Sequence, residues 1–357
     1  MPGKRLVLVG GGHAHVQVLH AMQSTEADIT LVSDVAFAPY SGMLPGHLAG
    51  SYEERDLVFD LAAICARRGH RFIQRAVVAV DADARCLTLS DGARLVFDVC
   101  SLNVGIVPKT IGSPAPVPNV IYVKPISNFL AQWRAATAVL SAHGRIVVVG
   151  GGAAAFELAI ACGIRFPGRV SLVTGENGLT LPRGATVLAR RALKDLAVEL
   201  AEGQRVEGID EGVLQLSRST KSFALALVAI TARPSELVTQ SPLPKSGDGH
   251  VIVDDFLRVQ GSSVVFAAGD CAHFGSLGLP KAGVYAVRQG PILAHNLRLA
   301  LEGGGELERY VPQKTILSIL LSGHDEAIFC WRGFALRSRW AARVKHWIDR
   351  RFMRRFS

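Results

Sequence analysis

Two runs of three glycines are the residues whose spacing points most clearly to chemistry. Gly10, Gly11 and Gly12 follow the run RLVLV, and Gly150, Gly151 and Gly152 follow RIVVV. In such a turn the first glycine permits a tight bend, and the next lets backbone N–H groups approach a pyrophosphate at the positive end of a helix. The two runs therefore predict two dinucleotide-binding turns.

Neither turn has the third glycine of the pattern G-x-G-x-x-G, because His15 takes its place in the first copy and Ala155 in the second. That glycine serves the close packing of helix on strand. We therefore expect His15 to change the helix–strand spacing and to leave the phosphate site intact. The residues that open the two helices, and that we expect beside the phosphates, are His13, Ala14 and Ala154.

A carboxylate about 20 residues after the turn would accept the ribose hydroxyls of a bound adenosine. The expected position is Ser33 in the first copy, with Asp34 beside it. In the second copy it is Thr174, with Glu176 two residues on. The second mismatch leaves NADH and NADPH as alternatives. Three basic side chains are candidates for a 2′-phosphate or are surface charges: Arg165, Arg169 and Arg183.

Around the glycines, the sequence predicts the elements of an α/β fold. Each turn is followed by a second strand, DITLVS over 28–33 and RVSLVT over 169–174. Two strand–glycine–helix–strand units about 140 residues apart predict two Rossmann-like domains with parallel sheets. Further helices are expected over 127–142 and 282–301, and a late strand ends in Gly269 and Asp270.

Composition excludes several classes of protein. The 357 residues are 49% hydrophobic and 19% charged, which is typical of a globular chain. No apolar run reaches the roughly 18–20 residues of a membrane-spanning helix, and the first strand begins near Arg5. We therefore expect a cytoplasmic protein without a secretory signal peptide. The six cysteines are scattered, and no His, Cys and carboxylate cluster has metal-ligand spacing, so no metal is predicted.

The net charge of +9 is concentrated in the C-terminal tail. Residues 331–357 hold nine Arg and Lys against Asp349 alone, a net charge of +8, which leaves +1 for the rest. Because the body lacks a basic excess, no nucleic-acid partner is predicted. As a helix, the tail suits an anionic membrane surface or packing against the body, a second subunit or a partner. Its apolar face consists of Trp340, Val344, Trp347, Ile348 and Phe352.

Together these segments resemble the flavoproteins with two dinucleotide-binding domains, the pyridine nucleotide-disulfide oxidoreductase superfamily. The resemblance implies that the first turn holds FAD, that the second holds NADH or NADPH, and that Asp270 contacts the ribityl chain. It also implies that the second domain is inserted in the first. The expected boundaries are 1–112 with 251–305 for the FAD-binding domain, 113–250 for the NAD(P)-binding domain, and 306–357 for a C-terminal region with a basic amphipathic helix.

The segment ITLVSDVAFAPYSGMLPGHLAG over 29–50 is similar to type II NADH dehydrogenases and sulfide:quinone reductases, which places Tyr40 and Pro45 against FAD. The motifs GGGHAHVQVL, PYSGMLPG, KAGVYAVRQGP and KHWIDRRFM resemble a flavoprotein subgroup found alone or fused ahead of selenide, water dikinase. The C-x4-C of the disulfide reductases is missing. The catalytic cysteines of the sulfide:quinone reductases have no clear counterpart, and Cys271 and Cys162 are candidates only by proximity.

The resemblance also assigns roles around the flavin. Glu157 would lie where nicotinamide meets flavin, either orienting the nicotinamide or pairing with Lys124. Gln289, within AVRQG, would face the electron acceptor, and Gly105 would lie on the strand that returns near the flavin. A late helix N-terminus would stabilise the negative charge of the reduced flavin. The residues expected there are Lys281, Ala282 and Gly283.

We therefore expect an FAD-dependent NAD(P)H oxidoreductase that passes electrons from nicotinamide through flavin to a quinone or another small acceptor. One alternative is an oxidoreductase of selenium or sulfur compounds, with selenophosphate synthetase as its partner. The other is a flavin-bearing docking protein without turnover. A quinone acceptor would bring the tail to the inner face of the cell membrane, because quinones dissolve in lipid.

Overall fold

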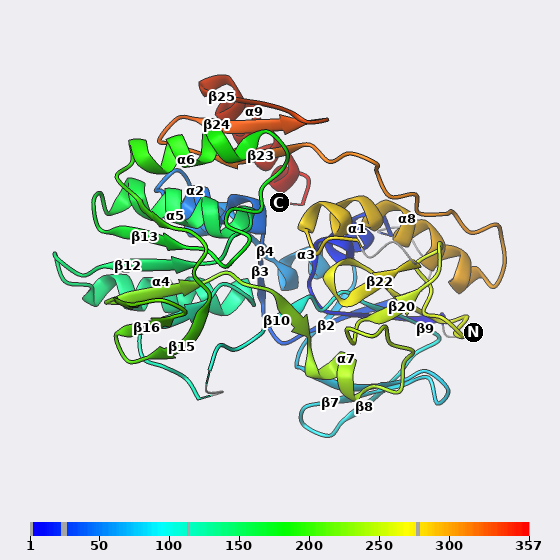
Figure 1. The fold of residues 1–357 in the computed structure, drawn as a ribbon. Helices are drawn as coiled ribbons and strands as arrows, with labels where there is room; N and C mark the ends of the chain where they lie inside the picture. The colour runs from blue at the N-terminus through cyan, green and yellow to red at the C-terminus, as the bar shows by residue number, and fades with distance from the viewer. Residues whose placement is uncertain (1–2, 23–26, 113–114, 276–278, 357) are drawn as a thin grey trace.

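The computed structural model describes residues 3–22, 27–112, 115–275 and 279–356. Figure 1 shows two α/β bodies side by side, joined by extended strands, with the C-terminal strands and helix lying over one end of the molecule. Each body is built on a five-stranded sheet. The sheet of the second body comes between strands of the first along the chain, which confirms the predicted α/β fold with two Rossmann-like domains, one inserted in the other.

The first sheet is parallel throughout, in the order β21-β9-β1-β2-β5. Its central strands are fully buried, as expected where a parallel sheet is covered on both faces. Helices α1 and α8 pack so closely together that a Cβ on Gly290 would lie 2.4 Å from Nε2 of Gln17. The bounds are β1 (Arg5–Val9), α1 (His13–Ala21), β2 (Asp28–Ser33), β5 (Arg71–Gln74), β9 (Val99–Leu102), β21 (Val265–Ala267) and α8 (Gly283–Glu302).

The second sheet repeats this design in the order β11-β18-β12-β13-β14, again with parallel pairs only. Its apolar strands IVVV, VSLV and LALV are buried along their whole length. The bounds are β11 (Val120–Tyr122), α4 (Ile126–Val139), β12 (Ile146–Val149), α5 (Ala153–Arg165), β13 (Val170–Val173), α6 (Ala185–Asp195), β14 (Glu199–Ala201) and β18 (Leu225–Val228).

Two short strands connect the bodies. The chain leaves the first body through β10 (Ile106–Pro108) and returns through β19 (Ala232–Pro234), and the two strands pair antiparallel. The next helix, α7 (Glu236–Gln240), already packs on β6 (Val77–Asp81) of the first body, where the Ser241 hydroxyl accepts a hydrogen bond from the Val80 N–H at 3.0 Å. The chain therefore packs against the first body from α7 onward.

The C-terminal region is a three-stranded antiparallel meander followed by one helix. These elements are β23 (Ser318–Leu321), β24 (Ala327–Trp331), β25 (Phe334–Ser338) and α9 (Arg339–Arg354). The Ser338 hydroxyl caps α9 by accepting a hydrogen bond from the Ala341 N–H at 3.1 Å. Among the described residues, no helix has the length and apolar character needed to cross a membrane.

Smaller elements complete the two bodies. The first contains β3 (Phe37–Pro39), η1 (Ser41–Met43), α2 (Leu44–Leu48), η2 (Glu54–Asp56), β4 (Val58–Asp60), α3 (Leu61–Arg67), β6 with β7 (Cys86–Leu89) and β8 (Arg94–Val96), β20 (Val251–Val253), η3 (Gly269–Cys271) and β22 (Ala272–Phe274). The second contains β15 (Val206–Asp210), β16 (Val213–Leu216) and β17 (Thr220–Ser222). Of these, β3, η1 and η3 matter for the site, because they surround the first glycine turn.

Candidate active site

The first glycine turn is closed by the end of β9. Gly10 has φ +91°, and a Cβ there would lie 2.6 Å from the carbonyl oxygen of Asn103. A Cβ on Gly12 would lie 2.1 Å from Oδ1 of the same asparagine. Both glycines are therefore required by the approach of a neighbouring strand, and the positive φ of Gly10 is a second reason for glycine there.

Asn103 joins three parts of the first body, and sequence reasoning missed it. Its Oδ1 accepts a hydrogen bond from the Ala14 N–H at 3.1 Å, and its Nδ2 donates to the Ala268 carbonyl at 2.7 Å. A Cβ on Gly269 would lie only 2.5 Å from this Nδ2. The signal available in the sequence was an asparagine at the end of a buried strand, two residues before Gly105. Asn103 thus fixes the glycine turn against the Gly-Asp turn.

His15 explains how the first turn works without its third glycine. The imidazole is fully buried, Nδ1 lies 2.7 Å from the Gly10 carbonyl oxygen, and Nε2 lies 2.9 Å from Oγ of Ser101. Because a carbonyl can only accept, Nδ1 carries the proton and Nε2 accepts from the serine hydroxyl. The side chain fastens the turn to β9 in place of a close helix–strand contact. Burial lowers the pKa of His15 to about 4, so it is neutral at physiological pH.

This burial predicts an acid-dependent loss of stability. The unfolded chain protonates His15 near pH 6.5, whereas the folded protein does so only near its pKa of about 4. The free energy of unfolding should therefore fall as the pH drops from 6.5 to 4, by on the order of 3 kcal/mol for this residue. His15→Gln is expected to flatten that limb in urea titrations, and the exposed His143→Gln is the control. An unchanged acid limb in His15→Gln would contradict the assignment.

The Gly-Asp turn is held by Gln289, a residue predicted to face the electron acceptor. Its Oε1 accepts a hydrogen bond from the Gly269 N–H at 2.7 Å, and the side chain is buried. This placement favours support of the turn over contact with an acceptor. Asp270, in the same turn, is paired with Lys124, because its Oδ2 lies 2.7 Å from Nζ of that lysine. The pair predicted as one option for Lys124, with Glu157, is therefore not the one formed.

The N-terminus of α8 lies next to this turn. Ala282 is its N-cap and Gly283 its first residue, close to η1, because a Cβ on Gly283 would lie 3.2 Å from Oγ of Ser41. Lys281 donates from Nζ to the Ala272 carbonyl at 2.7 Å, and burial lowers its pKa. The predicted cation is thus present at the helix start, fixed by a backbone carbonyl.

The other residues predicted for the first nucleotide lie around the same turn. Ser33 is buried at the end of β2, and its Oγ accepts a hydrogen bond from the Val35 N–H, while Asp34 is exposed. Pro45 is buried in α2, and Gly105 has φ +71° between β9 and β10. Of the two residues predicted to lie near the ribose, Asp34 is the one that is exposed and has a carboxylate.

The second glycine turn leaves open space at its helix. A Cβ on Gly150 would lie 2.3 Å from the Ala229 carbonyl and 2.9 Å from Cβ of Ala155, so the turn packs tightly against β18 and α5. A Cβ on Gly152, the N-cap of α5, would meet nothing within 4 Å, and Ala154 is exposed beside it. Open space next to the N-terminus of a helix is what a bound pyrophosphate requires.

At the ribose end of the second turn, Thr174 is buried and its Oγ1 has no partner, whereas Glu176 is exposed. Two of the three arginines proposed for a 2′-phosphate have other neighbours. Arg169 donates to the carbonyls of Ser141 and Gly144. The guanidinium of Arg165 lies over the ring of Trp133 at 5.9 Å. Glu176 and the third candidate, Arg183, are both exposed, so the charges of these two side chains leave NADH and NADPH as alternatives.

Glu157 lies in a buried charged cluster that the sequence did not reveal. Its Oε1 accepts a hydrogen bond from the Leu321 N–H at 2.8 Å and lies 3.9 Å from Nζ of Lys345 on α9. Nζ of Lys345 is also 3.5 Å from Oδ2 of Asp349 and donates to the Gly42 carbonyl at 3.0 Å. Burial raises the pKa of both Glu157 and Asp349. The tail therefore supplies part of the candidate site.

Aromatic side chains surround this cluster on the side of the first body. The ring of Phe352 on α9 lies 4.8 Å from Tyr40, which in turn lies 5.3 Å from the ring of His13. Phe59 packs edge-on to Phe352 at 6.1 Å. Burial lowers the pKa of His13 to about 4, so its imidazole is neutral. The apolar face predicted for the tail is divided: Phe352 is buried here, while Trp340 and Trp347 are exposed.

The residues present fit a dinucleotide at both turns. Helices α1, α5 and α8 begin without a capping side chain at the N-cap and without an acidic residue in the first turn, and in α1 one N–H, that of Ala14, donates to Asn103. Helix N-termini of this kind leave N–H groups and a positive dipole for an anion. The donors of the first turn and the open space at Gly152 therefore match two bound pyrophosphates, and within the described residues no cluster of metal ligands is found.

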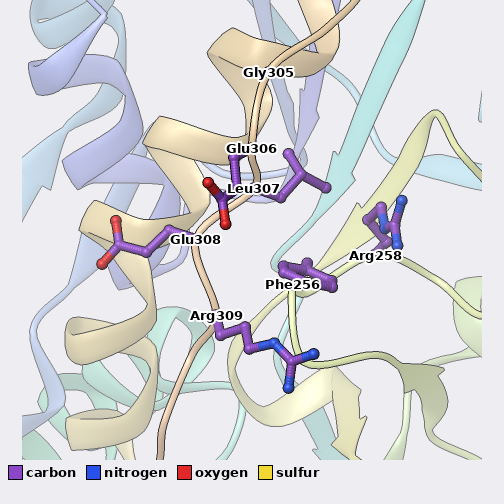
Figure 2. A pocket seen from close by; sticks show the side chains of 7 residues that line it. All are labelled: Phe256, Arg258, Gly305, Glu306, Leu307, Glu308 and Arg309. Carbon is purple, nitrogen blue, oxygen red and sulfur yellow. The ribbon is translucent and has the colours of Figure 1, made fainter.

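One cavity is lined by residues outside this site. It has a volume of about 670 Å³ and is lined by Phe256, Arg258 and residues 305–309 (Figure 2). The guanidiniums of Arg258 and Arg309 both lie over the Phe256 ring, and each is paired with an aspartate, Asp254 and Asp255. Both arginines of this cavity are thus already paired within the chain.

Residues 4–295 match the family model described as pyridine nucleotide-disulphide oxidoreductase. The chain belongs to the pyridine nucleotide-disulphide oxidoreductase family. This oxidoreductase is 25% identical over 390 residues to a type II NADH:quinone oxidoreductase of Staphylococcus aureus, covering 98% of the chain and 94% of the relative. It is 26% identical over 363 residues to ferroptosis suppressor protein 1 of Xenopus tropicalis, covering 92% and 89%.

Among solved structures, the oxidoreductase is similar to the sulfide:quinone oxidoreductase of Aquifex aeolicus. The TM-score is 0.81 at 17% identity, covering 99% of this chain and 91% of the other. At that identity the likeness shows the shared fold alone. Family membership confirms the predicted superfamily, and with it an FAD-dependent oxidoreductase that uses NADH or NADPH as co-substrate.

Proposed function

We propose that this oxidoreductase transfers electrons from NADH to a quinone. The observation that carries the proposal is the buried cluster of Glu157, Lys345 and Asp349 beside the rings of Tyr40 and Phe352. A quinone head group is flat and apolar apart from two carbonyl oxygens. Ring faces suit its plane, and an ammonium with two carboxyls suits its oxygens. The name of the Staphylococcus aureus relative, a NADH:quinone oxidoreductase, supports the same donor and acceptor.

The overall reaction is NADH, a proton and a quinone giving NAD⁺ and a quinol. When bound, FAD supplies the ring that accepts the hydride and passes on the electrons. Gly10, Gly12 and Asn103 would hold its pyrophosphate, and Asp270 its ribityl chain. The N–H groups at the start of α8 would face developing negative charge, where a helix dipole is stabilising.

The remaining proton must reach a quinone oxygen, and the buried cluster can hold it. Burial raises the pKa of the Glu157 carboxyl, so this group keeps a proton at higher pH than an exposed glutamate would. The ammonium of Lys345 beside it would stabilise negative charge that develops on a quinone oxygen. Phe352 and Tyr40 exclude water from the same place. Glu157 is therefore proposed as the proton donor and Lys345 as the electrostatic partner.

Sulfur or selenium chemistry at a cysteine finds less support. Cys271, the candidate nearest Asp270, is buried, donates from Sγ to backbone carbonyls, and has its pKa raised by burial to about 11. Burial raises the pKa of Cys162 to about 12. A thiol held neutral in this way is a poor nucleophile. The quinone proposal needs no reactive cysteine.

Anaerobic mixing tests the proposal. NADH is expected to bleach the flavin absorbance within seconds, and a short-chain benzoquinone should restore the colour. If Glu176, the exposed carboxylate two residues after Thr174, accepts the ribose hydroxyls, NADPH should bleach the flavin more slowly than NADH. Restoration by polysulfide or selenite but not by quinone would overturn the acceptor. Absence of bleaching with either nucleotide would overturn the donor.

We also propose that the exposed side of the tail binds an anionic membrane surface, where quinones are dissolved. Figure 1 places β24, β25 and α9 together at one end of the molecule. Phe334 and Trp347 are each 60% exposed and Trp340 is 56% exposed, which is unusual for large apolar side chains. Arginines accompany them on α9, and each basic residue near an anionic surface contributes about 1 kcal/mol.

The double variant Trp340→Ser and Trp347→Ser is expected to weaken binding to anionic vesicles by about tenfold or more, because burying one large apolar side chain contributes about 1.5–3 kcal/mol. Vesicle sedimentation measures the bound fraction. Val139→Ser, on α4 and 80% exposed, is the control and should bind like the parent protein. Equal binding of the double variant, or of all proteins to uncharged vesicles, would contradict the membrane assignment and favour a protein partner for this surface.

A further inference from the structure

We propose that Asp349 is a positioning residue of the redox site, which holds the ammonium of Lys345 between itself and Glu157. The inference deepens the proposed function and rests on it in one respect, the role of Glu157 at the reacting groups. Asp349 is the only acidic residue of the basic tail, between residues 331 and 357. Its burial inside the protein, on the side of α9 opposite the exposed tryptophans, calls for a reason other than surface charge balance.

The geometry of Lys345 gives that reason. Lys345 and Asp349 are one helical turn apart on α9, so their side chains share a face of the helix. The ammonium donates a hydrogen bond to the Gly42 carbonyl at 3.0 Å, and it forms ion pairs with Asp349 Oδ2 at 3.5 Å and with Glu157 Oε1 at 3.9 Å. Asp349 and Glu157 therefore share one ammonium, and without Asp349 the lysine would have Glu157 as its single carboxylate in the cluster.

The charges of the cluster do not balance. Exposed fractions of the side chains are 13% for Lys345, 13% for Glu157 and 5% for Asp349, so two buried carboxyls share one ammonium. If all three were ionised, the cluster would carry one uncompensated negative charge. Burial raises the pKa of Glu157, and the charge of Asp349 raises it further, while Lys345 lowers it. Asp349 and Lys345 thus act on the pKa of the Glu157 carboxyl in opposite directions.

Groups from several parts of the chain lie around the cluster. From the first body, the Tyr40 hydroxyl interacts with Asp349, and Tyr52 lies near it. From β23, the Leu321 N–H donates to Glu157. On α9 itself the charged and titratable neighbours are His346 and Arg350. Asp349 touches Lys345 and Tyr40, so any influence on Glu157 passes through the lysine or through its charge.

The test compares three FAD-loaded proteins: the parent, Asp349→Asn and Asp349→Glu. Infrared spectra recorded across the pH range follow the protonated carboxyl band, and Glu157→Gln identifies the part of that band that belongs to Glu157. In Asp349→Asn, Lys345 is left with a single carboxylate. The titration of Glu157 should therefore move to lower pH, by on the order of one unit. Asp349→Glu should restore most of the parent behaviour.

Asp195→Asn is the matched control. It removes the ion pair between Asp195, at the end of α6, and Arg337 of the tail, and it leaves the cluster intact. It should titrate like the parent. If Asp349→Asn does not accumulate as folded protein, Asp349→Ser, which is also neutral and smaller, measures the same shift. An unchanged Glu157 titration in the neutral variant would overturn the proposal. The spectra need no substrate, so a shift without quinone turnover would overturn the proposed function alone.

Discussion

Replacing Gly12 by alanine is expected to yield protein that is purified without flavin. The added Cβ would lie 2.1 Å from Oδ1 and 2.7 Å from the backbone oxygen of Asn103. The asparagine cannot turn aside, because it accepts from the Ala14 N–H and donates to the Ala268 carbonyl. Overpacking of this kind costs about 1–3 kcal/mol, and it would displace the start of α1 from the pyrophosphate. The ratio of flavin to protein absorbance measures the result.

Gly152→Ala is the matched variant, because Gly152 is the N-cap of the equivalent helix and also has ordinary negative φ. A Cβ there meets no protein atom within 4 Å. We expect a normal fold and a full complement of flavin, but a KM for NADH raised by about tenfold or more, because the methyl group enters the space of the nucleotide. Flavin content equal to the parent in Gly12→Ala would contradict the assignment of the first turn.

Replacing Lys345 by methionine is expected to be the most destabilising change in the tail. It would leave Glu157 and Asp349 buried without a cation, and removing one partner of a buried ion pair typically costs about 3–5 kcal/mol. Quinone turnover should fall with it, because the ammonium is the group proposed to face the quinone oxygen. Urea unfolding and steady-state turnover measure the two effects separately.

The pH dependence of this variant has a definite sign. Burial already raises the pKa of both carboxyls, and the ammonium of Lys345 lowers both. Loss of the ammonium should therefore raise both pKa values further. A carboxyl with a raised folded pKa takes up a proton on folding. Stability is therefore greatest below the unfolded pKa, about 4, and is lost as the pH rises through the folded value. The variant should be closer to the parent at pH 5 than at pH 8.

Lys221→Met provides the comparison for a surface pair. Its ammonium lies 2.7 Å from Oε1 of Glu199, but that glutamate side chain is 56% exposed. Exposed pairs contribute about 0–1 kcal/mol, so this variant should unfold nearly like the parent. If Lys345→Met behaved in the same way at pH 8, the cluster would have no energetic importance, and its role in the site would fail with it.

Local sequence patterns were enough to predict the elements that bind the nucleotides. The late helix expected over 282–301 is α8, Gly283–Glu302, and the helix expected over 127–142 is α4, Ile126–Val139. Both glycine turns follow buried strands, as their β-rich runs indicate. These signals depend on neighbours within a few residues, so a single sequence contains all of the information required.

Contacts between distant segments were beyond the reach of the same patterns. Asn103 meets Ala14 and Ala268, which lie 89 and 165 residues away, and one asparagine letter carries no trace of either partner. Gln289 was predicted to face an acceptor because its motif lies on the correct helix, but the orientation of α8 turns it to the Gly269 N–H. Periodicity cannot resolve which side of a buried helix meets a backbone group.

The tail shows the same limit more sharply. The spacing of its apolar residues predicted a helix with one apolar face, whereas the buried face of α9 also contains Lys345 and Asp349. The spacing of lysine and aspartate by four residues was visible in the sequence. What could not be seen was that Glu157, nearly two hundred residues earlier, would lie opposite them. Only the arrangement of the two bodies makes that pair into a site.

Lys345 links the two bodies, and this link should make them unfold together on heating. Its ammonium joins the Gly42 carbonyl of the first body to the Glu157 carboxyl of the second, while the strands that connect the bodies pair over only three residues each. Separating the bodies would break the contacts of this ammonium with Gly42 and Glu157. Thermal denaturation should therefore show one heat-absorption peak for both nucleotide domains, and the Lys345→Met protein should show two.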